Sequence, residues 1–339
     1  MIKFFRKIRQ NLLLEGKTSK YFKYAIGEIV LVVIGILIAL QINNWNEERK
    51  AAEKSELLLK QVHKELIFNI NKASKVIEQY RSKNNLVYDV THRNVTNEYY
   101  KNKGMFAFII LGQEAVEITD DAFKNLIDNQ DNFNDKQDVI ILQLKELYST
   151  NKKRVDLTDE ITTNLVLDYF KKFKDEKHWF FNLILTGELN DEVINYLLTD
   201  TIYFNMVANF QIINLGNHKR YTKEFRHNAL DAYSELSDYL QIEKDSSLIK
   251  NSNDYDHYLG TYTDNIFTHV IKKKNSKLVR TSFRNSNPTK RYTFNFYPDS
   301  KTSFTINNYL FGELSYNENN EVIGFIASNG NYKTEFLKK

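Results

Sequence analysis

The residues that could carry out chemistry are few in this chain, and they lie far apart in the sequence. No cysteine occurs, which excludes disulfides and thiolate chemistry. No two histidines stand four residues apart and no His-Glu-x-x-His motif is present, so the sequence indicates no metal site on a helix. The seven histidines are His63, His92, His178, His218, His227, His257 and His269. We therefore expect no catalytic residue, no cofactor and no bound metal.

Two acidic pairs stand where helices are expected to begin. They are Asp120-Asp121 and Asp191-Glu192, and Asn190 is placed to act as the N-cap of the second pair. Because the helix macrodipole favours negative charge at its N-terminus, we interpret both pairs as helix-start signals. A Ser-x-x-Lys pattern at Ser247 to Lys250 lacks the other motifs of the serine hydrolases that use it, so we do not interpret Ser247 as a nucleophile.

An apolar run near the N-terminus is the firmest signal in the sequence. From Ala25 to Ile42 the chain reads AIGEIVLVVIGILIALQI. At ~1.5 Å per residue, a helix of this length spans roughly 27 Å, close to the ~30 Å thickness of the hydrocarbon core. A cleaved signal peptide would have a shorter apolar core and a small-x-small cleavage site. We predict an uncleaved transmembrane helix at 24–44, with Trp45 at the interface between membrane and water.

The charges that flank this run predict its orientation. Residues 1–27 carry seven Lys and Arg against one acid, so the other 312 residues sum to −2 out of a net charge of +4. The positive-inside rule therefore places residues 1–23, a basic amphipathic arm, in the cytoplasm, where it can contact anionic lipids. Since the folded part carries no positive excess, we expect no binding to nucleic acid.

Four residues in and beside the span are candidates for a role in the membrane or in self-association. Glu28 is a carboxylate inside the apolar zone, which is costly unless it has a partner or a function. Gly35 and Ala39 form a small-xxx-small pair that allows two helices to pack closely. With Trp45, these are the candidate site residues, and a homo-oligomer or an envelope protein is the expected partner beside the lipid bilayer.

A recurring N-terminal pattern supports the same location. The KFFRKIRQ arm, the span YAIGEIVLVVIGILIALQINNWNE and the segment ITDDAFKNLIDNQ (118–130) are similar to a domain-of-unknown-function family of single-pass envelope proteins from Gram-negative bacteria. The resemblance is dense over 1–60 and looser through 240. It implies an inner-membrane protein with a periplasmic main body, and it implies no activity and no catalytic residue.

Residues 45–242 read as a periplasmic helical domain. A stripe with intervals of three and four residues runs through Leu59, Val62, Leu66, Ile70, Ala73, Ile77 and Tyr80. No Gly or Pro occurs between Gly35 and Gly104, so we expect this helix to continue directly from the span. Further helical blocks are expected at 119–170 and 190–241, and the apolar segment 105–111 between them is expected to be core or a partner surface. An antiparallel bundle would bury these faces.

The C-terminal part changes to a period-two pattern. After a polar linker at 243–256, residues 257–339 predict about eight short strands in an antiparallel sandwich or small closed barrel, filled by aromatic side chains. Residues Tyr258, Gly260, Tyr262, Leu278, Phe304 and Gly324 belong to a pattern similar to the lipocalin-like accessory domain of penicillin-binding-protein-like serine hydrolases. The expected fold class is α+β, with one transmembrane helix, a helical bundle and this β domain.

These features favour a non-enzymatic interaction or scaffold protein of the bacterial inner membrane. Two alternatives stay open, a ligand-binding sensor module that uses the C-terminal β domain and an unrecognised hydrolase.

Overall fold

A computed structural model describes residues 18–104, 108–112, 115–129, 133, 135–249, 252–274, 277–306, 310–329 and 331–339. The described residues fall into two compact units. The first comes from residues 1–58 and 129–133, and the second from residues 59–128 and 134–339. The basic arm predicted at the N-terminus lies outside the described residues up to residue 17.

The first unit contains the N-terminal part of helix α2 (Thr18–Thr91). This helix includes the only described stretch that is long and apolar enough to cross a membrane, and none of that stretch is buried within the chain. Beyond it, the Arg49 guanidinium lies 5.9 Å from the centre of the Trp45 ring. Helix α2 is continuous, as the absence of Gly and Pro predicted.

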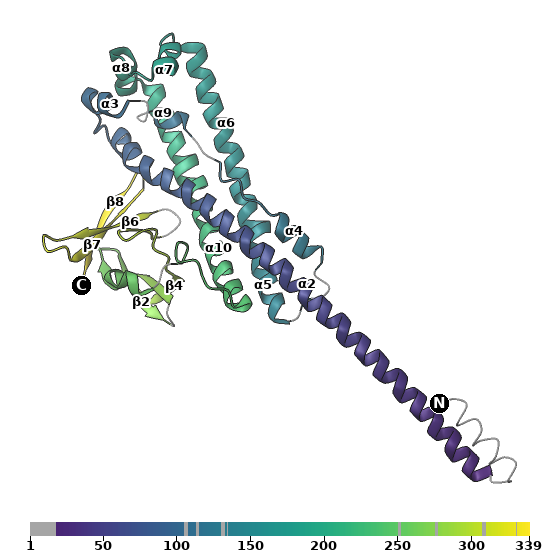
Figure 1. Ribbon diagram of the computed structural model, residues 1–339. Coiled ribbons are helices and arrows are strands. Elements are labelled where there is room, and N and C mark those ends of the chain that lie inside the picture. The colour runs from purple at the N-terminus through teal and green to yellow at the C-terminus, as the bar shows by residue number, and fades with distance from the viewer. Residues whose placement is uncertain are drawn as a thin grey trace. The chain divides into compact units, whose positions relative to one another are not determined.

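The second unit begins with a layer of helices (Figure 1). After α2 these are α3 (Asn97–Lys103), α4 (Asp121–Ile127), α5 (Asp135–Glu146), α6 (Lys152–Glu176), α7 (Phe180–Thr186), α8 (Asp191–Thr199), α9 (Thr201–Phe210) and α10 (Lys219–Leu240). Two π-helical segments, η4 (Leu147–Asn151) and η5 (Gln211–His218), join α5 to α6 and α9 to α10. Short 3-10 segments are η2 (Ile109–Leu111) and η6 (Ser252–Tyr258).

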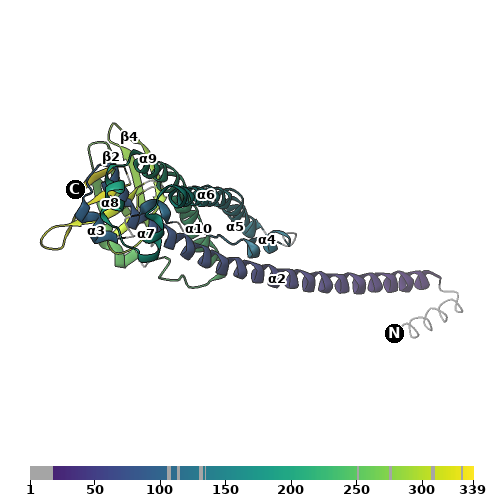
Figure 2. The same cartoon turned by 90° about the horizontal axis from the view of Figure 1, so that it is seen from above.

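The amphipathic stripe predicted on α2 is the buried face of this helix. All seven of its members, from Leu59 to Tyr80, are buried. The same face makes polar contacts with α10 and η5, where His63 Nε2 lies 2.8 Å from Ser237 Oγ and Tyr80 hydrogen-bonds His218. Both views show α10 running next to α2 and α6 (Figure 1, Figure 2). The helices thus share one core, as the sequence pattern predicted.

Two of the predicted local signals are also confirmed. Asn190 caps α8, since its side chain accepts a hydrogen bond of 2.9 Å from the Val193 N–H. In the apolar segment at 105–111, Phe108, Ile109 and Ile110 are buried, whereas residues 105–107 lie outside the described residues.

Eight antiparallel strands follow and confirm the α+β fold class. They are β1 (Gly260–Thr263), β2 (Phe267–Lys274), β3 (Lys277–Arg284), β4 (Asn287–Asn295), β5 (Ser303–Thr305), β6 (Phe311–Tyr316), β7 (Val322–Ser328) and β8 (Lys333–Lys338). Their order is β4-β3-β2-β1-β8-β7-β6-β5, which makes one curled half-barrel sheet with β4 and β5 at its edges. An isolated bridge between Pro298 and Phe304 brings the segment after β4 against β5.

Aromatic side chains fill the inside of the curled sheet, as the alternation of the strands predicted. Tyr258, Tyr262, Phe304, Phe325 and Phe336 are buried together. The ring of Phe304 packs over Gly312, where a Cβ atom would lie 2.5 Å from Phe304 Cζ. The close approach of this ring therefore requires glycine on β6.

Candidate functional site

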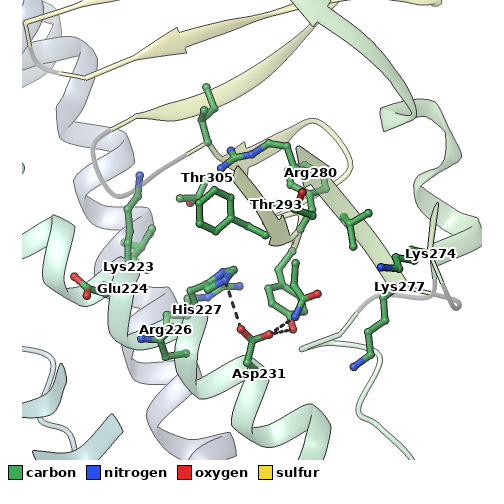
Figure 3. A pocket seen from close by; sticks show the side chains of 18 residues that line it. Lys223, Glu224, Arg226, His227, Asp231, Lys274, Lys277, Arg280, Thr293 and Thr305 are labelled. Atoms are coloured by element: carbon green, nitrogen blue, oxygen red, sulfur yellow. Dashed lines mark hydrogen bonds and ion pairs between the residues drawn. The ribbon is translucent and has the colours of Figure 1, made fainter. Parts of the chain in front are cut away.

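A pocket of about 970 Å³ lies between α10 and the sheet, within the second unit. It is lined by residues of α10, of strands β3 and β4 and the two residues after β4, and by the end of β5 with Ile306. Ile77 on α2 and Lys274 at the end of β2 complete the lining. Because β4 and β5 are the two edges of the half-barrel, the pocket occupies the side where the sheet does not close on itself. Figure 3 shows Lys223, Arg226 and Asp231 on α10 facing Arg280 and Thr293 on the sheet.

Asp231 on α10 forms hydrogen bonds to the sheet along one side of the pocket. Its Oδ1 atom accepts hydrogen bonds from Asn295 Nδ2 at 2.6 Å and from the Tyr297 hydroxyl at 2.5 Å. Its Oδ2 atom lies 3.6 Å from Nε2 of His227. Burial raises the pKa of Tyr297, and the negative charge of Asp231 raises it further. The phenol therefore stays a neutral donor to Asp231.

Positive charge dominates the pocket. Five lysines and arginines line it, against the two acids Glu224 and Asp231. Glu224 Oε1 is paired with Arg154 Nη1 at 3.2 Å, and Arg226 Nη1 is paired with Asp299 Oδ1 at 3.3 Å. Burial lowers the pKa of His227, and the charges of Arg280 and Arg226 oppose the attraction of Asp231. These interactions favour a neutral imidazole in an otherwise cationic pocket.

Arg280 is the least expected member of this pocket. It is 7 % exposed, and its Nε and Nη1 atoms are buried without a hydrogen-bond partner among the described residues. Burial alone lowers the pKa of Arg280 to about 10, with no carboxylate offsetting that effect. Its charge also helps burial to lower the pKa of His269, inside the sheet, to about 3. An unpaired buried guanidinium is costly, so its retention points to a use.

A second group of buried cations lies where α2 and α10 meet the β domain. The ring of Phe311 has Arg81, Lys219 and Lys223 within 4.4, 4.9 and 3.7 Å of its centre. Burial, helped by the charge of Arg81, lowers the pKa of Lys219 to about 7. Lys223 donates a hydrogen bond of 3.1 Å to the carbonyl of Leu310. This group fixes the β domain against the helices beside the pocket.

The four residues singled out from the sequence lie elsewhere, on α2 in the first unit. They are Glu28, Gly35, Ala39 and Trp45. A Cβ atom at Gly35 would have no atom within 4 Å, so this position is open to a partner helix. Among the described residues, no group of three or more His, Asp or Glu is arranged to hold a metal ion.

Sequence reasoning missed the pocket, although one signal pointed to it. Leu278 belongs to the C-terminal pattern noted in the sequence, and side chains two apart on a strand share a face. Leu278 is buried in the structure, and Arg280 shares its face of β3, where a charge is rarely placed. The α10 side of the pocket could not be predicted in this way, because its pairing with the sheet joins segments that are remote in sequence.

Comparison with known proteins finds a match to one protein family and indicates no activity. Residues 28–116 match a family described as a family of unknown function (DUF6090). The match covers the apolar part of α2, the buried stripe and the segment up to Val116. No curated protein and no solved structure matches the chain. The chain is thus an α+β protein with one candidate membrane span among its described residues, and residues 28–116 match a family of unknown function.

Proposed function

We propose that this chain is a non-enzymatic membrane-anchored receptor, whose second unit binds a small molecule between α10 and the curled sheet. The observation that carries the proposal is the pocket itself. Its volume of about 970 Å³ is in the range of small-molecule sites, and it combines apolar residues with a few placed polar groups. This pocket favours the ligand-binding alternative over the plain scaffold that the sequence favoured.

The proposal includes a membrane anchor that is connected to the pocket through helix α2. The apolar stretch of α2 is the anchor in the inner membrane, with the basic arm in the cytoplasm and the second unit in the periplasm. Because α2 runs from this anchor into the core beside α10, the helix that carries the anchor also supports the helix that lines the pocket. No hydrolytic step is proposed, since the pocket carboxylates are held by other side chains.

The test is to recover a ligand from the full chain purified in lipid nanodiscs. Mass spectrometry of the released small molecules should find one compound in near-equal amount to the protein. The double variant Val279→Trp/Thr293→Trp adds two indoles to the lining and should lose that compound. Thr281→Trp, on the same strand face as Val279 but outside the pocket lining, is the matched control and should retain it. Equal recovery from all variants, or no compound from any, would overturn the proposal.

A second function, contact with a protein partner, is supported by helix α7. Its residues Phe181, Ile184 and Leu185 follow helical spacing and are 68, 43 and 67 % exposed. Adjacent exposed apolar side chains of this size are typical of interaction surfaces. Crosslinking in intact envelopes should capture a partner with the native chain and lose it with Phe181→Lys/Leu185→Lys. An unchanged crosslinking pattern would remove this function.

A further inference from the structure

Arg280 lacks the anionic partner that a buried guanidinium needs. It lies on the same strand face as Leu278 and Ser282, and its register partner on β4 is Phe294. Of the two acids that line the pocket, Asp231 already contacts Asn295, Tyr297 and His227, and Glu224 is paired with Arg154. No carboxylate of the described residues is within ion-pair distance of Arg280. An anion that enters the pocket from outside the chain would offset this charge.

Two further cations at the pocket are also without a carboxylate partner in the described part of the chain. Lys274 and Lys277 face each other across the β2–β3 turn. Figure 3 shows both at the side of the pocket away from Lys223. Arg226 is paired with Asp299, and burial lowers the pKa of Lys223. Arg280, Lys274 and Lys277 therefore supply the excess of positive charge at the pocket. A group with two negative charges fits this excess better than a single carboxylate, and phosphate monoesters carry nearly two at neutral pH.

Apolar surface lies next to the free guanidinium. The carbon at the centre of the Arg280 guanidinium is 5.7 Å from the centre of the Phe294 ring. Phe294 is 45 % exposed, and Val279 and Phe296 line the same pocket. An anion bound by Arg280 would therefore have an aromatic ring beside it. Inorganic phosphate alone would leave this apolar part of the pocket uncovered.

We propose that the pocket binds a phosphate monoester of a small apolar group, with the phosphate at Arg280 and the apolar group against Phe294. This inference rests on the proposed receptor function and names the class of its ligand. Arg280 is the residue that sets the specificity, while Lys274 and Lys277 attract and hold the second negative charge. The ligand is held without bond formation or cleavage.

The experiment is calorimetric titration of the full chain in nanodiscs with four probes that share a ring or a phosphate. They are phenyl phosphate, benzoate, benzamide and inorganic phosphate. Phenyl phosphate should bind at least about 10-fold more tightly than each of the others, and its affinity should fall as salt rises. Dihexanoyl phosphatidic acid serves as a fifth probe. Tighter binding than phenyl phosphate would identify a lipid as the source of the phosphate, and weaker binding a soluble ester.

Three variants on β3 separate the specific contact from general charge. Arg280→Met should lower the affinity for phenyl phosphate at least about 10-fold. It should also raise the melting temperature of the ligand-free chain, because it removes an unpaired buried charge. Arg284→Met lies on the same strand face but is exposed and outside the pocket, so its affinity should equal that of the native chain. Lys277→Gln leaves the buried residues in place and should lower the affinity several-fold.

The outcomes distinguish this inference from the proposed function. Stronger binding of benzoate or benzamide than of phenyl phosphate would overturn the phosphate assignment and leave the receptor function standing. Binding of phenyl phosphate that survives both Arg280→Met and Lys277→Gln would also overturn it. If none of the probes binds and no compound is recovered from the purified chain, both proposals fail.

Discussion

The guanidinium of Arg81 on α2 lies 2.6 Å from the carboxylate of Asp299 in the β domain. Both side chains are mostly buried, at 18 and 12 % exposure, and the same carboxylate is 3.3 Å from Arg226 on α10. Asp299 also accepts a hydrogen bond from the Thr305 hydroxyl at 3.2 Å. One acid therefore ties two helices to the β domain beside the pocket, and it offsets part of the positive charge collected there.

Loss of this acid should destabilise the second unit. Asp299→Asn leaves Arg226 without its charge partner and Arg81 with only the exposed Glu78, and we expect the free energy of unfolding to fall by about 2–4 kcal/mol. Urea unfolding of the detergent-solubilised chain measures this change. The exposed pair Lys172–Glu176 on α6 is the control, since Glu176→Gln should cost less than about 0.5 kcal/mol. A similar loss in the free energy of unfolding for the two variants would show that Asp299 does not tie the helices to the β domain.

Gly324 on β7 should tolerate no side chain. A Cβ atom there would lie 2.3 Å from the carbonyl oxygen of Phe336 on β8, which is backbone and cannot rotate away. We expect Gly324→Ala to lower the free energy of unfolding by about 2 kcal/mol or more. Gly35→Ala, where a Cβ atom meets nothing within 4 Å, should leave the melting temperature unchanged. Equal stability of the native chain and Gly324→Ala would show that β7 and β8 are not paired as described.

His269 should make the β domain sensitive to acid. Burial, helped by the charge of Arg280, lowers its pKa to about 3 from 6.5, so the folded chain binds fewer protons than the unfolded chain in this range. The contribution to stability is therefore fully present above pH 6.5 and is lost as the pH falls toward 3, by at most about 1.4 kcal/mol per unit. His269→Gln should show a shallower fall between pH 6.5 and 5 in urea unfolding. If the stability of the native chain and of His269→Gln falls in parallel with pH, His269 is not the cause of the acid sensitivity.

The proposed topology can be tested because the chain has no cysteine of its own. Two single-cysteine variants report which side of the membrane each part of the chain occupies. Lys23→Cys lies before the apolar stretch, and Lys174→Cys is at an exposed position on α6. A membrane-impermeant maleimide added to intact spheroplasts should label Lys174→Cys and leave Lys23→Cys unlabelled. After lysis both should react, which controls for access. Labelling of Lys23→Cys in intact spheroplasts would reverse the orientation.

Self-association through the span is expected to depend on Gly35. Its open helix face, with Ala39 one turn on, allows close approach of a second copy. Gly35→Ile should reduce the crosslinked dimer in native membranes at least about 5-fold. Gly27→Ile is the matched control, because Gly27 is equally open but has no small residue four positions on. A dimer that persists in Gly35→Ile would exclude this face as the contact.

The sequence alone determined the elements whose signals are local. The intervals of three and four from Leu59 to Tyr80 defined the buried face of α2, and Asn190 marked the start of α8. Alternation in the C-terminal part predicted the eight strands and their aromatic interior. Each of these depends on residues a few positions apart, where helix and strand periods act directly.

Only the tertiary structure decided how these elements form a site. Arg81, Arg226 and Asp299 are remote in sequence, and Asp231 meets Asn295 across 64 residues. Their pairing follows from which helix covers the open side of the sheet, and no local period encodes that choice. The unpaired charge of Arg280 likewise has meaning only once its burial is known, since the cost of a guanidinium depends on the solvent around it.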